Sequence, residues 1–87
     1  MEGALRKALE RQVAYFLEFF RTGRDGQRAK VHQEFHTAAS VEQARQYASA
    51  MMKFTTFTGL AADCCTIRDR RGDLLSEVTA EVYRLRR

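Results

Sequence analysis

The sequence predicts a small α+β protein in which a three-stranded antiparallel sheet packs with two helices, in the order α-β-α-β-β. Three observations lead to this fold class. Apolar residues recur at helical spacing in the first quarter of the chain, a two-residue alternation follows, and two β-prone runs flank a glycine-containing turn near the end. Because the chain has 87 residues and no proline or low-complexity linker, we expect one domain over residues 1–87.

The first predicted element is a helix over residues 3–22. Its apolar stripe has spacings of four, four, three and four residues, at Leu5, Leu9, Val13, Phe16 and Phe20. Tyr15, Leu17 and Phe19 widen the stripe beyond the roughly 100° that a helix usually buries. Since a chain this small has little surface to cover it, we expect a protein interface formed by Tyr15, Phe16, Phe19 and Phe20.

A strand is predicted next, over residues 28–37. Ala29, Val31, Gln33 and Phe35 alternate there with Lys30, His32, Glu34 and His36. This two-residue period is typical of a strand with one buried face. We expect the histidines to lie on the solvated face, with Lys30 and Glu34.

The second predicted helix runs from residue 41 to about residue 55. Ser40-Val41-Glu42-Gln43 has the form of a capping box, in which the Ser and Gln side chains satisfy unpaired amides at the helix start. Val41, Ala44, Ala48, Met51 and Met52 then follow at helical spacing and are expected in the core. Residues 55–58 are interpreted as a fraying last turn that ends near Gly59.

The remaining residues predict a hairpin. Residues 64–69 and 74–78 are β-prone and flank a charged turn that contains Gly72. The tail, residues 74–86, fits both periods. Its β-branched residues and the repulsion of Glu77 and Glu81 one helical turn apart favour a strand, and a helix is the alternative.

Charge and composition suggest one class of partner. The net charge is +4 and the pI is about 9.5, which favours polyanions because Lys and Arg neutralise phosphates. Arg68, Arg70 and Arg71 at the hairpin are the best candidate nucleic-acid contacts. However, acidic residues are interspersed, and the sequence shows no aromatic residues interleaved with these arginines to stack on bases.

Several catalytic and ligand-binding classes find no support. The turn at residues 23–26 lacks the glycines and the Gly-Lys-Ser/Thr sequence of a phosphate-binding loop. Cys64 and Cys65 are adjacent, so they diverge on a strand and are expected to be reduced thiols. With His32 and His36 they form the only metal-like set, at unfavourable spacing. We therefore predict no enzyme activity, cofactor, metal or small-molecule substrate.

The leading hypothesis is a nonenzymatic protein–protein interaction, regulatory or assembly module. Its aromatic first helix is expected to bind a second copy of the chain, as in a homodimer, or else a partner protein. The alternative is a basic nucleic-acid-binding accessory protein that uses Arg68, Arg70 and Arg71. No apolar run approaches the roughly 18 residues needed to span a bilayer, and the N-terminal segment is amphipathic and charged. We therefore expect a small soluble protein of the cytoplasm with no membrane contact.

Overall fold

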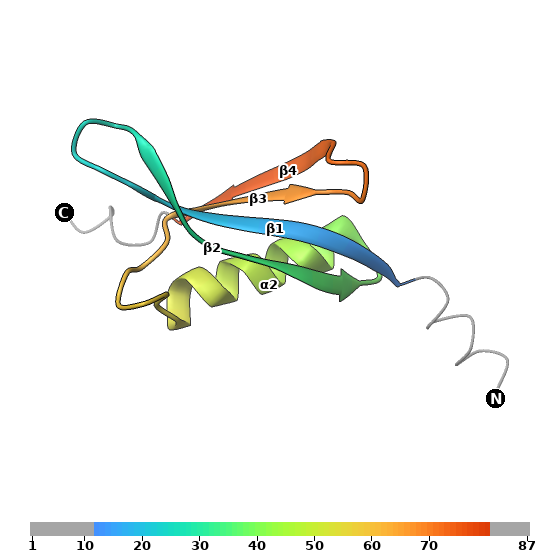
Figure 1. Cartoon of the computed structure of the whole chain (residues 1–87). Helices are drawn as coiled ribbons and strands as arrows, with labels where there is room; N and C mark the ends of the chain where they lie inside the picture. The colour runs from blue at the N-terminus through green and yellow to red at the C-terminus, as the bar shows by residue number, and fades with distance from the viewer. Residues whose placement is uncertain (1–11, 81–87) are drawn as a thin grey trace, which may run out of the picture.

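The computed structural model describes residues 12–80, which form a four-stranded antiparallel sheet with a helix along one face (Figure 1). The elements in chain order are β1 (Val13–Thr22), β2 (Arg28–Ala38), α2 (Val41–Phe54), β3 (Cys64–Arg68) and β4 (Leu74–Thr79). In the sheet the strand order is β2-β1-β3-β4. The α+β class is confirmed, but the described order is β-β-α-β-β, so the prediction of three strands and two helices is wrong. No helix among the described residues is long and apolar enough to cross a membrane.

The largest correction concerns the predicted first helix. Residues 13–22 of it form β1, the strand that pairs with both β2 and β3, while residues 3–11 lie outside the described part of the chain. Apolar side chains occur on both sides of this segment, so its spacing fits a helix as well as a strand. Its aromatic residues favour a strand, and hydrogen bonding to two neighbouring strands decides the conformation.

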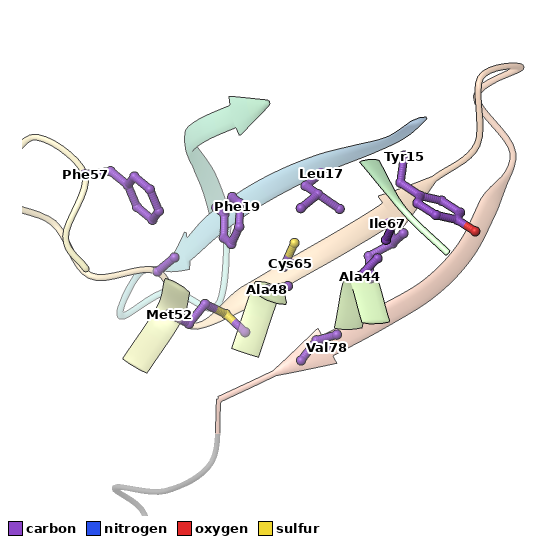
Figure 2. Close-up of a cluster of buried hydrophobic side chains, with 12 residues drawn as sticks. Tyr15, Leu17, Phe19, Ala44, Ala48, Met52, Phe57, Cys65, Ile67 and Val78 are labelled. Carbon is purple, nitrogen blue, oxygen red and sulfur yellow. The ribbon is translucent and has the colours of Figure 1, made fainter. Parts of the chain in front are cut away.

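The core lies between the sheet and α2. Tyr15, Leu17 and Phe19 alternate along β1 and are buried against the helix (Figure 2). The helix contributes the small or flexible side chains of Ala44, Ala48 and Met52 to this layer. β3 adds Cys65 and Ile67, and β4 adds Val78. Ala44 and Ala48 are fully buried, and because their side chains are small, α2 can approach the sheet closely.

β2 is confirmed as a strand, and Val31 packs against the core as predicted, but the predicted buried face is wrong from His32 to His36. His32, Glu34 and His36 lie opposite Phe19, Leu17 and Tyr15, so they face α2. Phe35 instead lies opposite Phe16, on the other face of the sheet. The two histidine rings are accommodated under the helix by stacking, since His36 packs on Tyr47 and His32 on Phe57.

A β-bulge changes the alternation within β2. Phe19 pairs with His32, but Phe20 pairs with Lys30, so Val31 is an extra residue in the strand. As a result Lys30 lies on the same face as Phe35, although the two are an odd number of residues apart. No strictly alternating pattern could have predicted this.

The predicted start of the helix is confirmed. Ser40 is the N-cap, and its hydroxyl accepts a hydrogen bond from the Gln43 amide at 3.2 Å. The Gln43 side chain accepts from the amide of Ala39, one residue before the position that a capping box predicts. Residues 41 and 54 bound the helix, close to the predicted 41–55.

The segment after α2 is a tight turn and not a fraying helical end. Thr58 and Gly59 both have positive φ, and Phe57 and Leu60 exchange two backbone hydrogen bonds of 2.7 and 3.0 Å. This turn buries Phe57, whose ring contacts Phe19. Thr55 is extended, as its β-branched side chain favours, whereas Thr58 has φ of 51°, in the left-handed region that β-branched residues rarely adopt.

The predicted hairpin is confirmed. β3 and β4 pair antiparallel around the β3–β4 turn, residues 69–73. The tail is a strand as far as Thr79, in agreement with the prediction, and residues 81–86 of the predicted strand lie outside the described residues.

Candidate functional site

The face of the sheet opposite α2, here called the open face, carries the residues of greatest chemical interest. The strand register places on it Phe16, Glu18, Lys30, Phe35, Arg68 and Glu77. These residues come from all four strands. Within the described part of the chain, no helix or loop packs over them (Figure 1).

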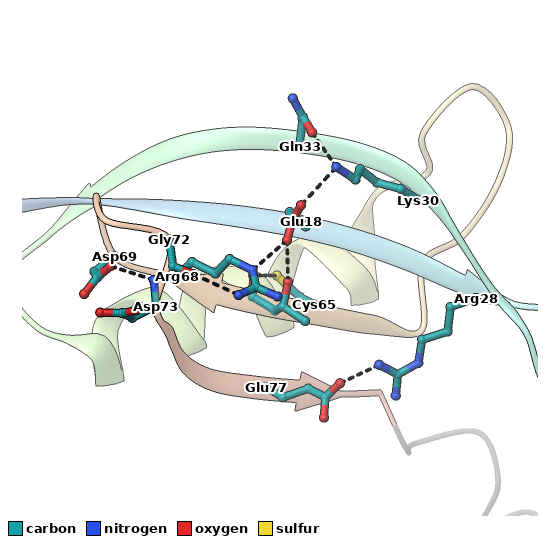
Figure 3. A network of polar contacts seen from close by, with 11 residues as sticks. Glu18, Arg28, Lys30, Gln33, Cys65, Arg68, Asp69, Gly72, Asp73 and Glu77 are labelled. Carbon is teal, nitrogen blue, oxygen red and sulfur yellow. Dashed lines mark hydrogen bonds and ion pairs between the residues drawn. The ribbon is translucent and has the colours of Figure 1, made fainter.

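Glu18 lies at the centre of the open face and binds a cation on each side (Figure 3). One carboxylate oxygen is 2.9 Å from Lys30 Nζ, and the other is 3.1 Å from Arg68 Nε and also accepts from the Thr66 hydroxyl. The hydrogen bond from Lys30, with those from Arg68 and Thr66, lowers the pKa of Glu18 even though burial opposes the shift. Glu18 is therefore ionised at neutral pH.

A second carboxylate, Glu77 on β4, pairs with Arg28 on β2. The Arg28 guanidinium donates to Glu77 at 2.6 Å, and the Cys64 thiol donates to the same oxygen at 3.2 Å. The hydrogen bond from Arg28 lowers the pKa of Glu77. Three cations of the open face, Arg28, Lys30 and Arg68, are thus paired with carboxylates of the same face.

Two phenylalanine rings lie side by side near one end of the open face. Phe16 of β1 and Phe35 of β2 are directly paired across the strands, with ring centroids 5.1 Å apart and a tilt of 43°. Phe35 is 69% exposed, which is unusual for so large an apolar side chain in a strand. The pair leaves aromatic surface accessible to a ligand.

The β3–β4 turn holds two arginines next to these rings. Asp69 accepts hydrogen bonds from the amides of Arg71 and Asp73, both at 2.9 Å, and Arg68 donates to the Gly72 carbonyl. These bonds define the turn. Arg70 and Arg71 are exposed, and within the described residues neither guanidinium has a hydrogen-bond or ion-pair partner.

The rings and the arginines enclose a shallow hollow of about 200 Å³. Its lining consists of Phe16 and Phe35 on one side and of residues 69–72, including Arg70 and Arg71, on the other. Apolar ring surface therefore adjoins positive charge that has no partner among the described residues. This combination suits a ligand that has both a flat apolar group and an anionic group.

The structure divides the predicted protein-interface residues into two groups. Tyr15 and Phe19 are in the core under α2, whereas Phe16 and Phe20 lie on the opposite face and are partly exposed. The excess of ring surface that suggested an interface is therefore smaller than the sequence implies. An interface formed by the remaining two rings stays a prediction.

The predicted nucleic-acid contacts are divided as well. Arg70 and Arg71 adjoin Phe16, so one residue of the interface set and two of the nucleic-acid set share the hollow. Arg68 is instead paired with Glu18. Sequence reasoning missed Phe35 and Glu18, and only the β1–β2 register, in which Phe35 pairs with Phe16 and Gln33 with Glu18, assigns both to this face.

The histidines and cysteines do not form a common site. Glu34 accepts a hydrogen bond from the Tyr47 hydroxyl and lies 2.8 Å from His32 Nε2, between β2 and α2. Cys64 and Cys65 are free, buried and on opposite faces of β3. Among residues 12–80, no three such side chains are grouped so that they could hold a metal ion.

No protein-family model, curated protein or solved structure matches this chain. The open face is therefore the main basis for proposing a function.

Proposed function

We propose that the protein is a nonenzymatic binding module whose open face binds single-stranded nucleic acid. The observation that carries the proposal is the hollow in which the rings of Phe16 and Phe35 adjoin Arg70 and Arg71, whose guanidinium groups have no partner within residues 12–80. A base can stack on an exposed ring while the adjoining phosphate accepts hydrogen bonds from a guanidinium. The net charge of +4 supports association with a polyanion.

The hollow favours single strands over duplexes. In a duplex the flat faces of the bases are stacked on one another, so they are not accessible to a ring on a sheet. Phe35 offers its ring at the surface and no deep groove accompanies it. Specificity for sequence is not expected, because stacking accepts every base.

The decisive experiment is a pair of matched substitutions. Phe35→Ala removes the exposed ring of the open face, whereas Phe54→Ala removes a ring that is 77% exposed on α2. We expect Phe35→Ala to weaken binding of a fluorescent oligothymidine about tenfold, as the loss of one stacked base predicts. Phe54→Ala is expected to bind like the wild type, and fluorescence anisotropy at low salt measures both.

The same titrations separate the possible ligands. Oligothymidine and oligouridine distinguish DNA from RNA, and a duplex of equal length tests the requirement for unstacked bases. Arg70→Ala with Arg71→Ala is expected to weaken binding further and to reduce its dependence on salt. Absence of wild-type binding to any single strand at low salt would refute the proposal.

Self-association through the open face is the second candidate. Its support is the internal pairing of Glu18 and Glu77 with Arg28, Lys30 and Arg68, because a second protein surface could cover these five side chains without leaving any of them unpaired. Phe16, Phe20 and Leu74 would then join Phe35 in the interface. Light scattering after size exclusion tests this: a dimer that persists in high salt and is lost in Phe35→Ala supports it, and a monomer excludes it.

A further inference from the structure

We infer that Glu18 limits the affinity of the open face for nucleic acid by keeping Lys30 and Arg68 from phosphates, so that Arg70 and Arg71 are the principal phosphate contacts. The inference rests on the proposed function and adds a residue that determines its strength. It follows from how the cations of the face are distributed among residues 12–80: Arg70 and Arg71 lack partners there, and three other cations are paired with carboxylates.

The position of Glu18 makes it an effective competitor. Its side chain is 14% exposed, and it lies on β1 between Lys30 of β2 and Arg68 of β3 (Figure 3). Each cation also has a second acceptor, Gln33 for Lys30 and the Gly72 carbonyl for Arg68. An incoming phosphate would have to displace a carboxylate that is already in contact and held on a central strand.

The dependence of affinity on salt concentration reports how many of these cations contact phosphates. Each phosphate neutralised on a single strand contributes a slope of about −0.7 to the plot of log affinity against log salt. Two contacts, from Arg70 and Arg71, predict a slope of about −1.4, or about a sevenfold loss of affinity when salt rises fourfold. Four contacts, with Lys30 and Arg68 added, predict about −2.8, or about a fiftyfold loss.

The experiment therefore looks for a variant that binds oligothymidine more tightly than the wild type. Glu18→Gln keeps the shape of the side chain and removes its charge. We expect it to bind oligothymidine more tightly than the wild type at about 50 mM salt and to lose about fiftyfold in affinity by about 200 mM. The control is Glu42→Gln on α2, which changes the net charge equally but pairs only weakly with Arg45, at 3.7 Å. It is expected to keep the wild-type slope.

A second variant covers the case in which Glu18→Gln does not fold, which circular dichroism will show. Glu77→Gln removes the more exposed carboxylate and releases Arg28 alone, so a slope of about −2.1 is expected. The inference is overturned if the wild type binds and Phe35→Ala weakens binding, but the folded Glu variants keep the wild-type slope. If instead no variant and no wild-type protein binds, the proposed function itself has failed.

Discussion

Glu34 is a carboxylate that lies between the sheet and the helix, in a protein with little room to bury charge. Burial alone would raise its pKa, but hydrogen bonds from Tyr47 and His32 outweigh that effect and lower it. The hydrogen bond to Glu34 raises the pKa of Tyr47 to about 12, so the phenol remains a donor at neutral pH. These hydrogen bonds therefore satisfy polar side chains of β2 that face α2, contrary to the predicted orientation of that strand.

The lowered pKa of Glu34 makes stability depend on pH. A carboxyl group with a lowered pKa in the folded state contributes stability above its unfolded pKa, and the contribution is lost as pH falls through the folded pKa. For Glu34 that loss occurs below the usual value of 4.5. The charged hydrogen bond from Tyr47 therefore matters at neutral pH and ceases to matter in acid.

Tyr47→Phe tests this residue. It keeps the ring that stacks on His36 and removes only the hydroxyl group that Glu34 accepts from. We expect the free energy of unfolding to fall by about 1.5–3 kcal/mol at pH 7, the usual contribution of a hydrogen bond to a charged group. At about pH 3 the difference from the wild type should shrink, because Glu34 is being protonated. Urea unfolding at both pH values measures it, and an equal loss at both would contradict the assignment.

At the scale of elements, the β3–β4 turn determines where two arginines of the candidate site lie. Gly72 has φ of 95°, in the region that side chains with a Cβ rarely adopt, and its amide donates to the Asp69 carbonyl. Gly26 in the β1–β2 turn has a similar φ of 83° and likewise no neighbouring atom that a Cβ would meet. The two glycines thus form a matched pair, of which only Gly72 borders the hollow.

Substituting alanine for each glycine separates the effect of backbone strain on stability from the effect of the turn on nucleic-acid binding. Gly72→Ala and Gly26→Ala should each lower the free energy of unfolding by about 1–2 kcal/mol through backbone strain. Only Gly72→Ala is expected to weaken nucleic-acid binding, several-fold, because it shifts Arg70 and Arg71 relative to Phe35. Thermal unfolding measures the stability of both variants, and fluorescence anisotropy measures their nucleic-acid binding. Equal binding by the two variants would show that the turn conformation does not position the arginines.

At the scale of the whole molecule, a single sheet separates a packed layer from an open one, and β3 runs through the interior of that sheet. Cys64 and Cys65 lie side by side on β3 but on opposite faces, and both are buried. Burial, with smaller contributions from nearby negative charges, raises the pKa of Cys64 to about 11 and that of Cys65 to about 12. Both thiols should therefore be unreactive while the fold is intact.

Thiol labelling tests that expectation. At pH 8 about one Cys64 thiol in a thousand is ionised in the folded protein, compared with roughly a quarter for an ordinary cysteine. Iodoacetamide should therefore label the native protein at least about a hundredfold more slowly than the protein in urea. Mass spectrometry of the time course measures the two rates. Rapid labelling without denaturant would mean that β3 is not enclosed as described.

The sequence by itself determined those elements whose signals are adjacent in the chain. The N-cap Ser40 with Gln43 places the start of α2, and Gly72 between two β-prone runs places the β3–β4 hairpin. Two-residue alternation identifies β2 as a strand. Caps, turns and the period of a strand depend on neighbours a few residues away, so they can be predicted without knowing the fold.

The tertiary structure alone decided everything that depends on pairing between distant segments. Residues 13–22 are apolar on both sides, and hydrogen bonds to β2 and β3 made them a strand. Pairing with β1 set which side chains of residues 32–38 face α2, and the bulge at Val31 put Lys30 on the same face as Phe35. The candidate site brings Phe16, Phe35 and the 70–71 arginines together from three separate segments, and no local pattern in the chain encodes such a meeting.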